Sequence, residues 1–236
     1  MKTIETNKHF AILDEIENSY KLIIYGLKEL QNMGVYNKYY FLSLQLLSQG
    51  IERWLKIYIC LSYFDKNEKL PNHREIKKYS HNLELLHKDI TELYFKKEDF
   101  KNQFLLDFEF LTNNDDLKRL LNILSKFGEK SRYHCMDVIT DNPNKDIDVI
   151  ESWKDFENDI KKKFNYNLTI TDEYLENLQE KINTYIIVII EKYLSAISRQ
   201  FIHEFHGELP KIMIMNNFYN FGKIYDGEYG AKDYSK

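Results

Sequence analysis

The most constraining feature of this sequence is a long stretch, residues 171–206, in which apolar side chains recur every three or four positions. Its apolar members are Leu175, Leu178, Ile182, Tyr185, Ile186, Ile189, Tyr193, Ile197 and Phe201. That spacing places them on one face of an α-helix. Thr171, followed by two acidic residues, is a typical helix start because its side chain and the two charges match the free amides. Gly207 and Pro210 predict that the helix ends near His206.

The same periodicity predicts helices along most of the remaining chain. Their expected spans are residues 9–31, 37–63, 80–93, 97–111, 114–140 and, with mostly exposed side chains, 152–164. Ser80 is the expected cap of the third, after a loop over residues 65–79. The chain has only 8 Gly and 3 Pro, too few turn-forming residues for many tight hairpins.

We therefore expect an all-α protein, an antiparallel bundle of about six helices forming one domain over residues 1–206. Residues 207–236 are rich in Tyr, Phe, Asn and Gly. We expect them to form a non-helical C-terminal tail, which could fold as a short hairpin on the bundle.

Composition restricts the class of protein. The net charge of −4 provides no overall basic field for nucleic acid, so RNA binding would require a local patch. Cys60 and Cys135 lie far apart in apolar patterns, which argues against a disulfide framework. The first residues lack the apolar core of a signal peptide, and the longest apolar run, residues 186–190, is too short to span a bilayer. We expect a cytoplasmic protein, and the heavy use of Lys, Asn, Ile and Tyr is typical of an AT-rich bacterial genome.

The segment His203–His206, with the sequence HEFH, resembles a zinc-protease helix only superficially. That chemistry requires two histidines four positions apart on one helix face, whereas these two are three apart. No further ligand is apparent nearby. We therefore expect no metal and no other cofactor.

Arg199, His203 and His206 share one helical face because four and three positions separate them. An imidazole can accept the proton of an RNA 2′-hydroxyl, and a guanidinium can stabilise the charge at phosphorus. These three residues are therefore candidates for a metal-independent endoribonuclease site. The alternative is structural, because cations are also favoured near the C-terminal end of a helix dipole.

Four further polar residues are candidate binding residues. Glu52 and Lys56 are four positions apart, which suits an ion pair within one helix. His81 lies at an expected helix start, where the dipole lowers its proton affinity. Arg132 is expected at a surface or a helix–helix contact. For each, a structural role is the alternative.

Three stretches, in order, resemble the HEPN superfamily of prokaryotic helical domains, over roughly residues 42–139. They are LLSQGIERWLKIYICLSY, YSHNLELL and LLNILSKFGEKSRYHCMDVI. The corresponding positions are Glu52, Lys56, His81, Leu83, Leu86, Arg132 and Tyr133.

The resemblance implies an antiparallel, often dimeric, helical bundle with roles in RNA cleavage, RNA or nucleotide binding, toxin–antitoxin pairs and phage defence. Nuclease members carry an Arg followed, after four to six residues, by a His. Arg132 has no such partner, while Arg199 with His206 and Arg74 with His81 fit the spacing.

The resulting hypothesis is a HEPN-like, non-catalytic protein that binds RNA or a protein partner. The first alternative is the endoribonuclease that uses Arg199 with His203 or His206. The second alternative is a structural subunit that dimerises through the small residues Gly128, Ser131 and Cys135, which would allow close helix approach.

Overall fold

The computed structural model describes residues 3–97, 102–130, 139–141, 149–164 and 171–236. In this described part, ten α-helices and one π-helical turn account for the regular structure, and no strand is present. They are α1 Thr6–Gln31, α2 Tyr40–Asn67, α3 His73–Lys77, α4 Leu83–Asp89, the π-turn Ile90–Tyr94, α5 Asn102–Asn113, α6 Asp115–Glu129, α8 Val149–Lys163, α9 Asp172–Ile202, α10 Glu208–Ile214 and α11 Tyr219–Gly222. The all-α expectation is confirmed for these residues, although the helices are more numerous than expected.

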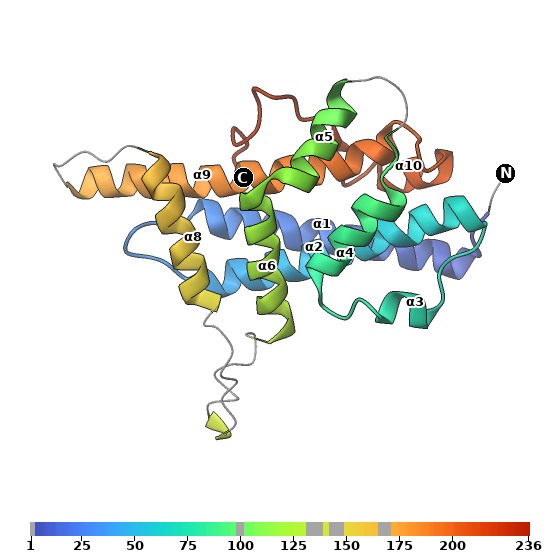
Figure 1. The fold of residues 1–236 in the computed structure, drawn as a ribbon, viewed down its shortest axis with the longest axis horizontal. Helices are drawn as coiled ribbons and strands as arrows, with labels where there is room; N and C mark the ends of the chain where they lie inside the picture. Colours follow the sequence, from blue (N-terminus) through green and yellow to red (C-terminus); the bar gives the residue numbers. More distant parts are fainter. Residues whose placement is uncertain (1–2, 98–101, 131–138, 142–148, 165–170) are drawn as a thin grey trace.

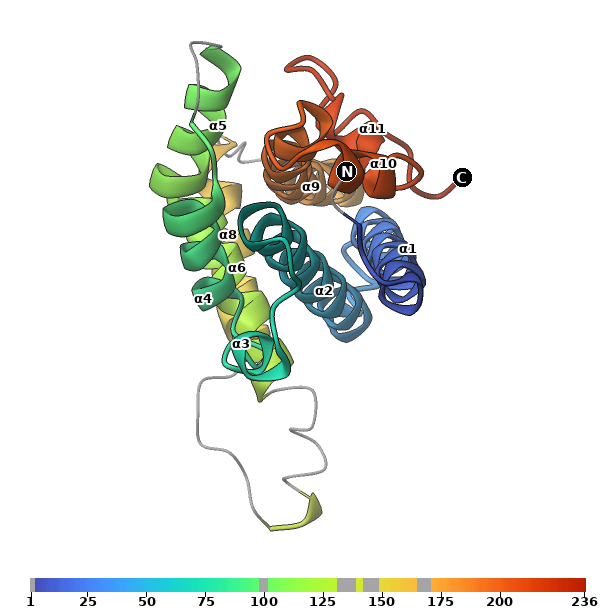
Figure 2. The same ribbon diagram turned by 90° about the vertical axis from the view of Figure 1, so that its right-hand side faces the viewer.

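The long helices α1, α2 and α9 run side by side and form the centre of the molecule (Figure 1). In the orthogonal view, α2 lies between α1 on one side and the shorter α4 and α6 on the other (Figure 2). Because α2 has neighbours on both sides, its aromatic side chains are deeply buried, as Trp54 and Tyr58 illustrate. Among the described residues, no helix is both long and apolar enough to cross a membrane.

The α1–α2 contact depends on two glycines. A Cβ atom added at Gly26 would lie 2.7 Å from Leu47 Cγ, and one at Gly50 would lie 2.9 Å from the backbone nitrogen of Ile23. Each glycine carbonyl accepts a hydrogen bond from a serine of the facing helix, Ser43 to Gly26 at 3.2 Å and Ser19 to Gly50 at 2.9 Å. The two helices therefore approach backbone to backbone.

Three local predictions are wrong. The loop predicted before residue 80 contains α3, whose start is fixed by a reciprocal capping box between Asn72 and Glu75. Ser80 lies in a left-handed turn with φ of 47°, and the cap of α4 is Asn82, whose side chain accepts from Leu85 N at 2.7 Å. The span 152–164 is predicted to be mostly exposed, yet Trp153 of α8 is fully buried because α6 and α9 cover that face.

The C-terminal region also differs from its prediction. The long helix α9 ends at Ile202 and not at His206. Gly207 then adopts φ of 84°, and α10 starts at once, with Pro210 in its first turn, where a missing amide hydrogen costs nothing. The segment 207–236 thus contains α10 and α11 in place of a hairpin.

This segment is folded onto α9 and α1 rather than extended from them (Figure 2). Tyr234 is buried and donates its hydroxyl to Glu191 Oε1 at 2.6 Å, while the amide of Gly230 donates to Glu191 Oε2 at 2.6 Å. The amide of Tyr234 donates to Gln31 on α1 at 2.7 Å. The tail is therefore part of the core.

Candidate functional site

Glu52 is the centre of a polar network on α2. Lys56, one turn later, donates from Nζ to Glu52 Oε1 at 2.6 Å and to the carbonyl of Ser80 at 2.6 Å. The second carboxylate oxygen of Glu52 lies 2.9 Å from His81 Nδ1. The ion pair within the helix was predicted from its spacing, whereas the contact with His81 depends on the turn that precedes α4.

Helix α6 borders this network. A Cβ atom at Gly128 would lie 3.7 Å from Ser48 Oγ and 3.9 Å from His81 Cβ, which is ordinary van der Waals contact, so α6 lies directly against α2 and the turn that holds His81. We use the name α2–α6 seam for the strip along α2 and its border with α6. It comprises Phe41, Gln45, Ser48, Glu52, Lys56, His81, Phe127 and Gly128.

An exposed aromatic group forms one end of the seam. Phe41 packs edge-on against Phe127, with ring centroids 5.3 Å apart, yet 40% of its surface remains exposed. Tyr39 is 63% exposed with its ring 6.5 Å from Phe41, and Leu42 follows at 36%. This group was not predicted from the sequence, although Phe41 lies off the buried face defined by Leu44 and Leu47.

Two of the predicted binding residues, Arg132 and Tyr133, lie outside the described residues. The same is true of Ser131 and Cys135 from the proposed small-residue dimer face. Gly128, the described member of that face, is buried against Ser48 and His81 of its own chain.

Arg199 is buried and bound to a carboxylate. Its Nε and Nη2 donate to the two oxygens of Asp107 on α5, at 2.7 and 2.5 Å. Both side chains are less than a tenth exposed. Although burial by itself lowers the pKa of a guanidinium, the Asp107 partner outweighs it and the pKa of Arg199 rises. A guanidinium held in this way cannot approach a scissile phosphate without leaving Asp107 unpaired in the interior.

His206 and His203 have surroundings different from those of Arg199. His206 is buried, and its Nε2 lies 3.1 Å from the Tyr58 hydroxyl on α2. Burial, reinforced by the nearby Lys96 ammonium, lowers the pKa of His206 to about 3, so the ring is neutral at ordinary pH. His203 is exposed and lies edge-on to Phe104 with ring centroids 5.2 Å apart. The three candidate catalytic residues thus serve three different contacts.

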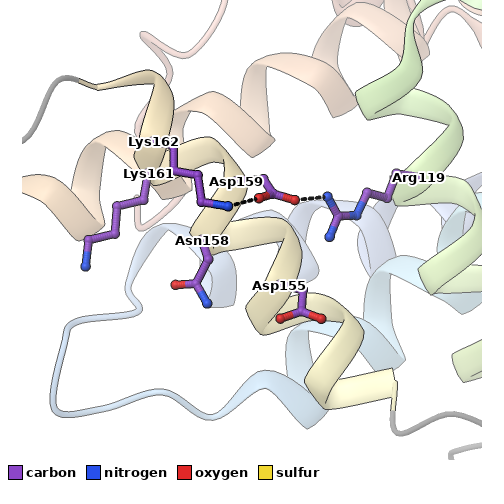
Figure 3. A pocket seen from close by; sticks show the side chains of 6 residues that line it. All are labelled: Arg119, Asp155, Asn158, Asp159, Lys161 and Lys162. Atoms are coloured by element: carbon purple, nitrogen blue, oxygen red, sulfur yellow. Dashed lines mark hydrogen bonds and ion pairs between the residues drawn. The ribbon is translucent and has the colours of Figure 1, made fainter.

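A polar hollow of about 450 Å³ lies between α6 and α8 (Figure 3). Asp159 on α8 accepts from Lys162 of the same helix and from Arg119 of α6, each at 2.6 Å, and so links the two helices. These two cations lower the pKa of Asp159 to about 2. The lining holds the three cations Arg119, Lys161 and Lys162 and the two carboxylates Asp155 and Asp159, so its own acidic residues offset most of the positive charge and weaken its attraction for phosphate.

Within the described part of the chain, no group of three or more His, Cys, Asp or Glu side chains is placed to hold a metal ion. A comparison of the chain with family models, curated proteins and solved structures finds no match.

Asp107, the partner of Arg199, was not predicted as a site residue. A signal was available, since Asp107 is one of two acidic residues in the largely apolar stretch FLLDFEF. A carboxylate on a buried helix face requires a cation or several donors. Its partner could not be chosen from the sequence, because 92 positions separate the two.

Proposed function

We propose that this chain is a HEPN-like, non-catalytic binding protein that engages a protein partner through the α2–α6 seam. The observation that carries the proposal is the exposed ring of Phe41 beside the internally balanced Glu52–Lys56–His81 network. Exposed apolar side chains next to satisfied polar groups are typical of protein contact sites. Phe41, Tyr39 and Leu42 supply the apolar anchor, and His81, whose side chain is 37% exposed, supplies the polar rim.

A protein partner fits better than RNA on electrostatic grounds. Binding to a nucleic acid requires cations whose charge is available to phosphates. Lys56 is bound to Glu52, Arg119 and Lys162 to Asp159, and the net charge of the chain is −4. Lys56 is the one Lys or Arg side chain among the seam residues, and its pairing with Glu52 favours an apolar contact there.

The absence of catalysis in this proposal rests on Arg199 and His206. The first is bound to Asp107 at both ends of the carboxylate, and the second is a buried neutral imidazole. A general base must reach the proton that it abstracts, and His206 is 1% exposed.

The test is affinity purification of the tagged full-length chain from its own cells, followed by the double variant Tyr39→Ala, Phe41→Ala. A partner recovered with the wild-type chain is expected to be lost from this variant. Tyr225→Ala, at an even more exposed aromatic residue away from the seam, is the control and should retain the partner. Equal recovery with the double variant would contradict the proposal.

Two further measurements separate the alternatives. Filter binding of a mixed RNA pool at physiological salt is expected to show no retention, and incubation with that pool is expected to leave it intact. Retention would favour RNA as the ligand, and cleavage would restore the nuclease hypothesis. Sedimentation of the purified chain at micromolar concentration shows whether the partner is a second copy, in which case Phe41→Ala should reduce the dimer.

A further inference from the structure

A cavity of about 230 Å³ lies at the meeting point of α5, α9 and the C-terminal tail. Its volume is equivalent to about eight water molecules in the liquid, which suits a small metabolite. The residues that carry the argument are Leu106, Phe110, Lys192, Arg199, Asp226 and Tyr229. The cavity lies outside the α2–α6 seam, so this inference is independent of the proposed function.

The guanidinium of Arg199 is only partly used by its own chain. The Asp107 carboxylate occupies Nε and Nη2 and also accepts from Gln103 at 3.0 Å, which completes that group of contacts. By contrast, Nη1 has only contacts of 3.4 Å, to the Ile224 carbonyl and the Tyr229 hydroxyl. These exceed the usual 2.7–3.2 Å range of such hydrogen bonds, so Nη1 retains donor capacity at the cavity wall.

Two opposite charges on the cavity wall have no counter-charge of their own. Among the described residues, neither Lys192 on α9 nor Asp226 in the tail forms an ion pair. The Lys192 ammonium lies over the Tyr229 ring at 5.5 Å. Since Arg199 and Asp107 neutralise each other, the cavity presents one available cation and one available anion.

We propose that this cavity binds a small zwitterion of the α-amino acid class with an apolar side chain. Its carboxylate accepts from Lys192 and from Arg199 Nη1. Its ammonium group pairs with Asp226. Its side chain contacts Leu106, which is 52% exposed without a ligand, and Phe110.

The position of Tyr229 follows from the fold of the tail. Arg199 and Lys192 both belong to α9, and the tail returns along this helix through Gly230, whose φ is 78°. The tail thereby adds Asp226 and Tyr229 to a wall that α5 and α9 leave incomplete. A ligand in the cavity would contact both the helices and the tail, so its binding is expected to stabilise the tail against α9.

The experiment is isothermal titration of the purified full-length chain with leucine, methionine and phenylalanine at millimolar concentration, in parallel with thermal unfolding. At least one of them is expected to bind and to raise Tm. Its analogues without the ammonium group (4-methylpentanoate for leucine) and without the carboxylate (3-methylbutylamine) should each bind at least about tenfold more weakly, because each loses one charged contact.

Lys192→Met and Asp226→Asn should each weaken the same ligand by at least about tenfold. Lys181→Met, at an exposed lysine of the same helix outside this cavity, should bind as the wild type does. Absence of binding by all three amino acids, equal binding of an analogue, or unchanged affinity in Asp226→Asn would overturn the proposal. Asp226 is exposed, so its variant remains informative if Lys192→Met does not fold.

Discussion

The pair of Arg199 and Asp107 illustrates how much depends on single residues in this protein. Replacement of Asp107 by Ala leaves a guanidinium buried without its carboxylate. We expect a loss of about 3–5 kcal/mol in the free energy of unfolding, measured by urea denaturation. The double variant Asp107→Leu, Arg199→Leu is the control and should lose less than Asp107→Ala, because neither charge remains buried. Equal losses would show that the charge pair is not the cause.

Two buried histidines predict how stability depends on pH. Burial lowers the pKa of His206 to about 3 and that of His87 to about 4, from an ordinary value of 6.5. Below pH 6.5 the unfolded chain binds protons at these sites that the folded chain does not. Each site therefore reduces stability by up to about 1.4 kcal/mol per pH unit as pH falls from 6.5 toward its folded pKa.

The corresponding measurement is the free energy of unfolding of the wild type and of His206→Gln, at pH values spaced by about one unit between about 7 and about 4. The variant loses one titrating group, so its stability should fall less steeply with acid. Carboxylates affect both proteins alike, and the difference between the two curves isolates the imidazole. Parallel curves would mean that His206 accepts a proton in the folded protein.

At the scale of elements, the glycines between α1 and α2 set the separation of the two helices. Gly50→Ala would place a methyl carbon 2.9 Å from the backbone nitrogen of Ile23, which cannot move independently of α1. We expect a loss of about 1–3 kcal/mol in thermal or urea unfolding. Gly227→Ala is the matched control, because a Cβ atom there meets nothing within 4 Å. A similar loss in both variants would contradict the steric explanation, because Gly→Ala at an open site restricts the unfolded chain and should not destabilise the fold.

At the scale of the whole molecule, the tail connects the C-terminal segment to the first helix, α1. The Tyr234 hydroxyl donates to the buried Glu191, and the Tyr234 backbone amide donates to Gln31 of α1, 203 positions away. Tyr234→Phe keeps the ring but leaves one oxygen of a buried carboxylate without its donor. We expect a loss of about 1–3 kcal/mol and faster hydrogen exchange at residues 230–236. Tyr225→Phe, at an exposed position, should change neither quantity.

Apolar periodicity is a property of each segment alone, and it was enough to predict the all-α class and the approximate position of the long helices. The sequence also predicted two helix starts that the structure confirms, where Asn114 accepts from Leu117 N and Thr171 from Tyr174 N. The helix over residues 208–214 was missed because Gly207 and Pro210 are signals for a stop and equally for a new start.

The contacts and charge partners of the polar residues depend on the tertiary structure. Lys56 and Glu52 could be paired from the sequence, because one helical turn separates them, but His81 joins them only through the turn before α4. Arg199 had the composition of a catalytic residue and became half of a buried ion pair when α5 brought Asp107 beside it. The physical reason is that a side chain's burial, charge partner and pKa depend on which distant segments approach it, and local spacing carries no record of that approach.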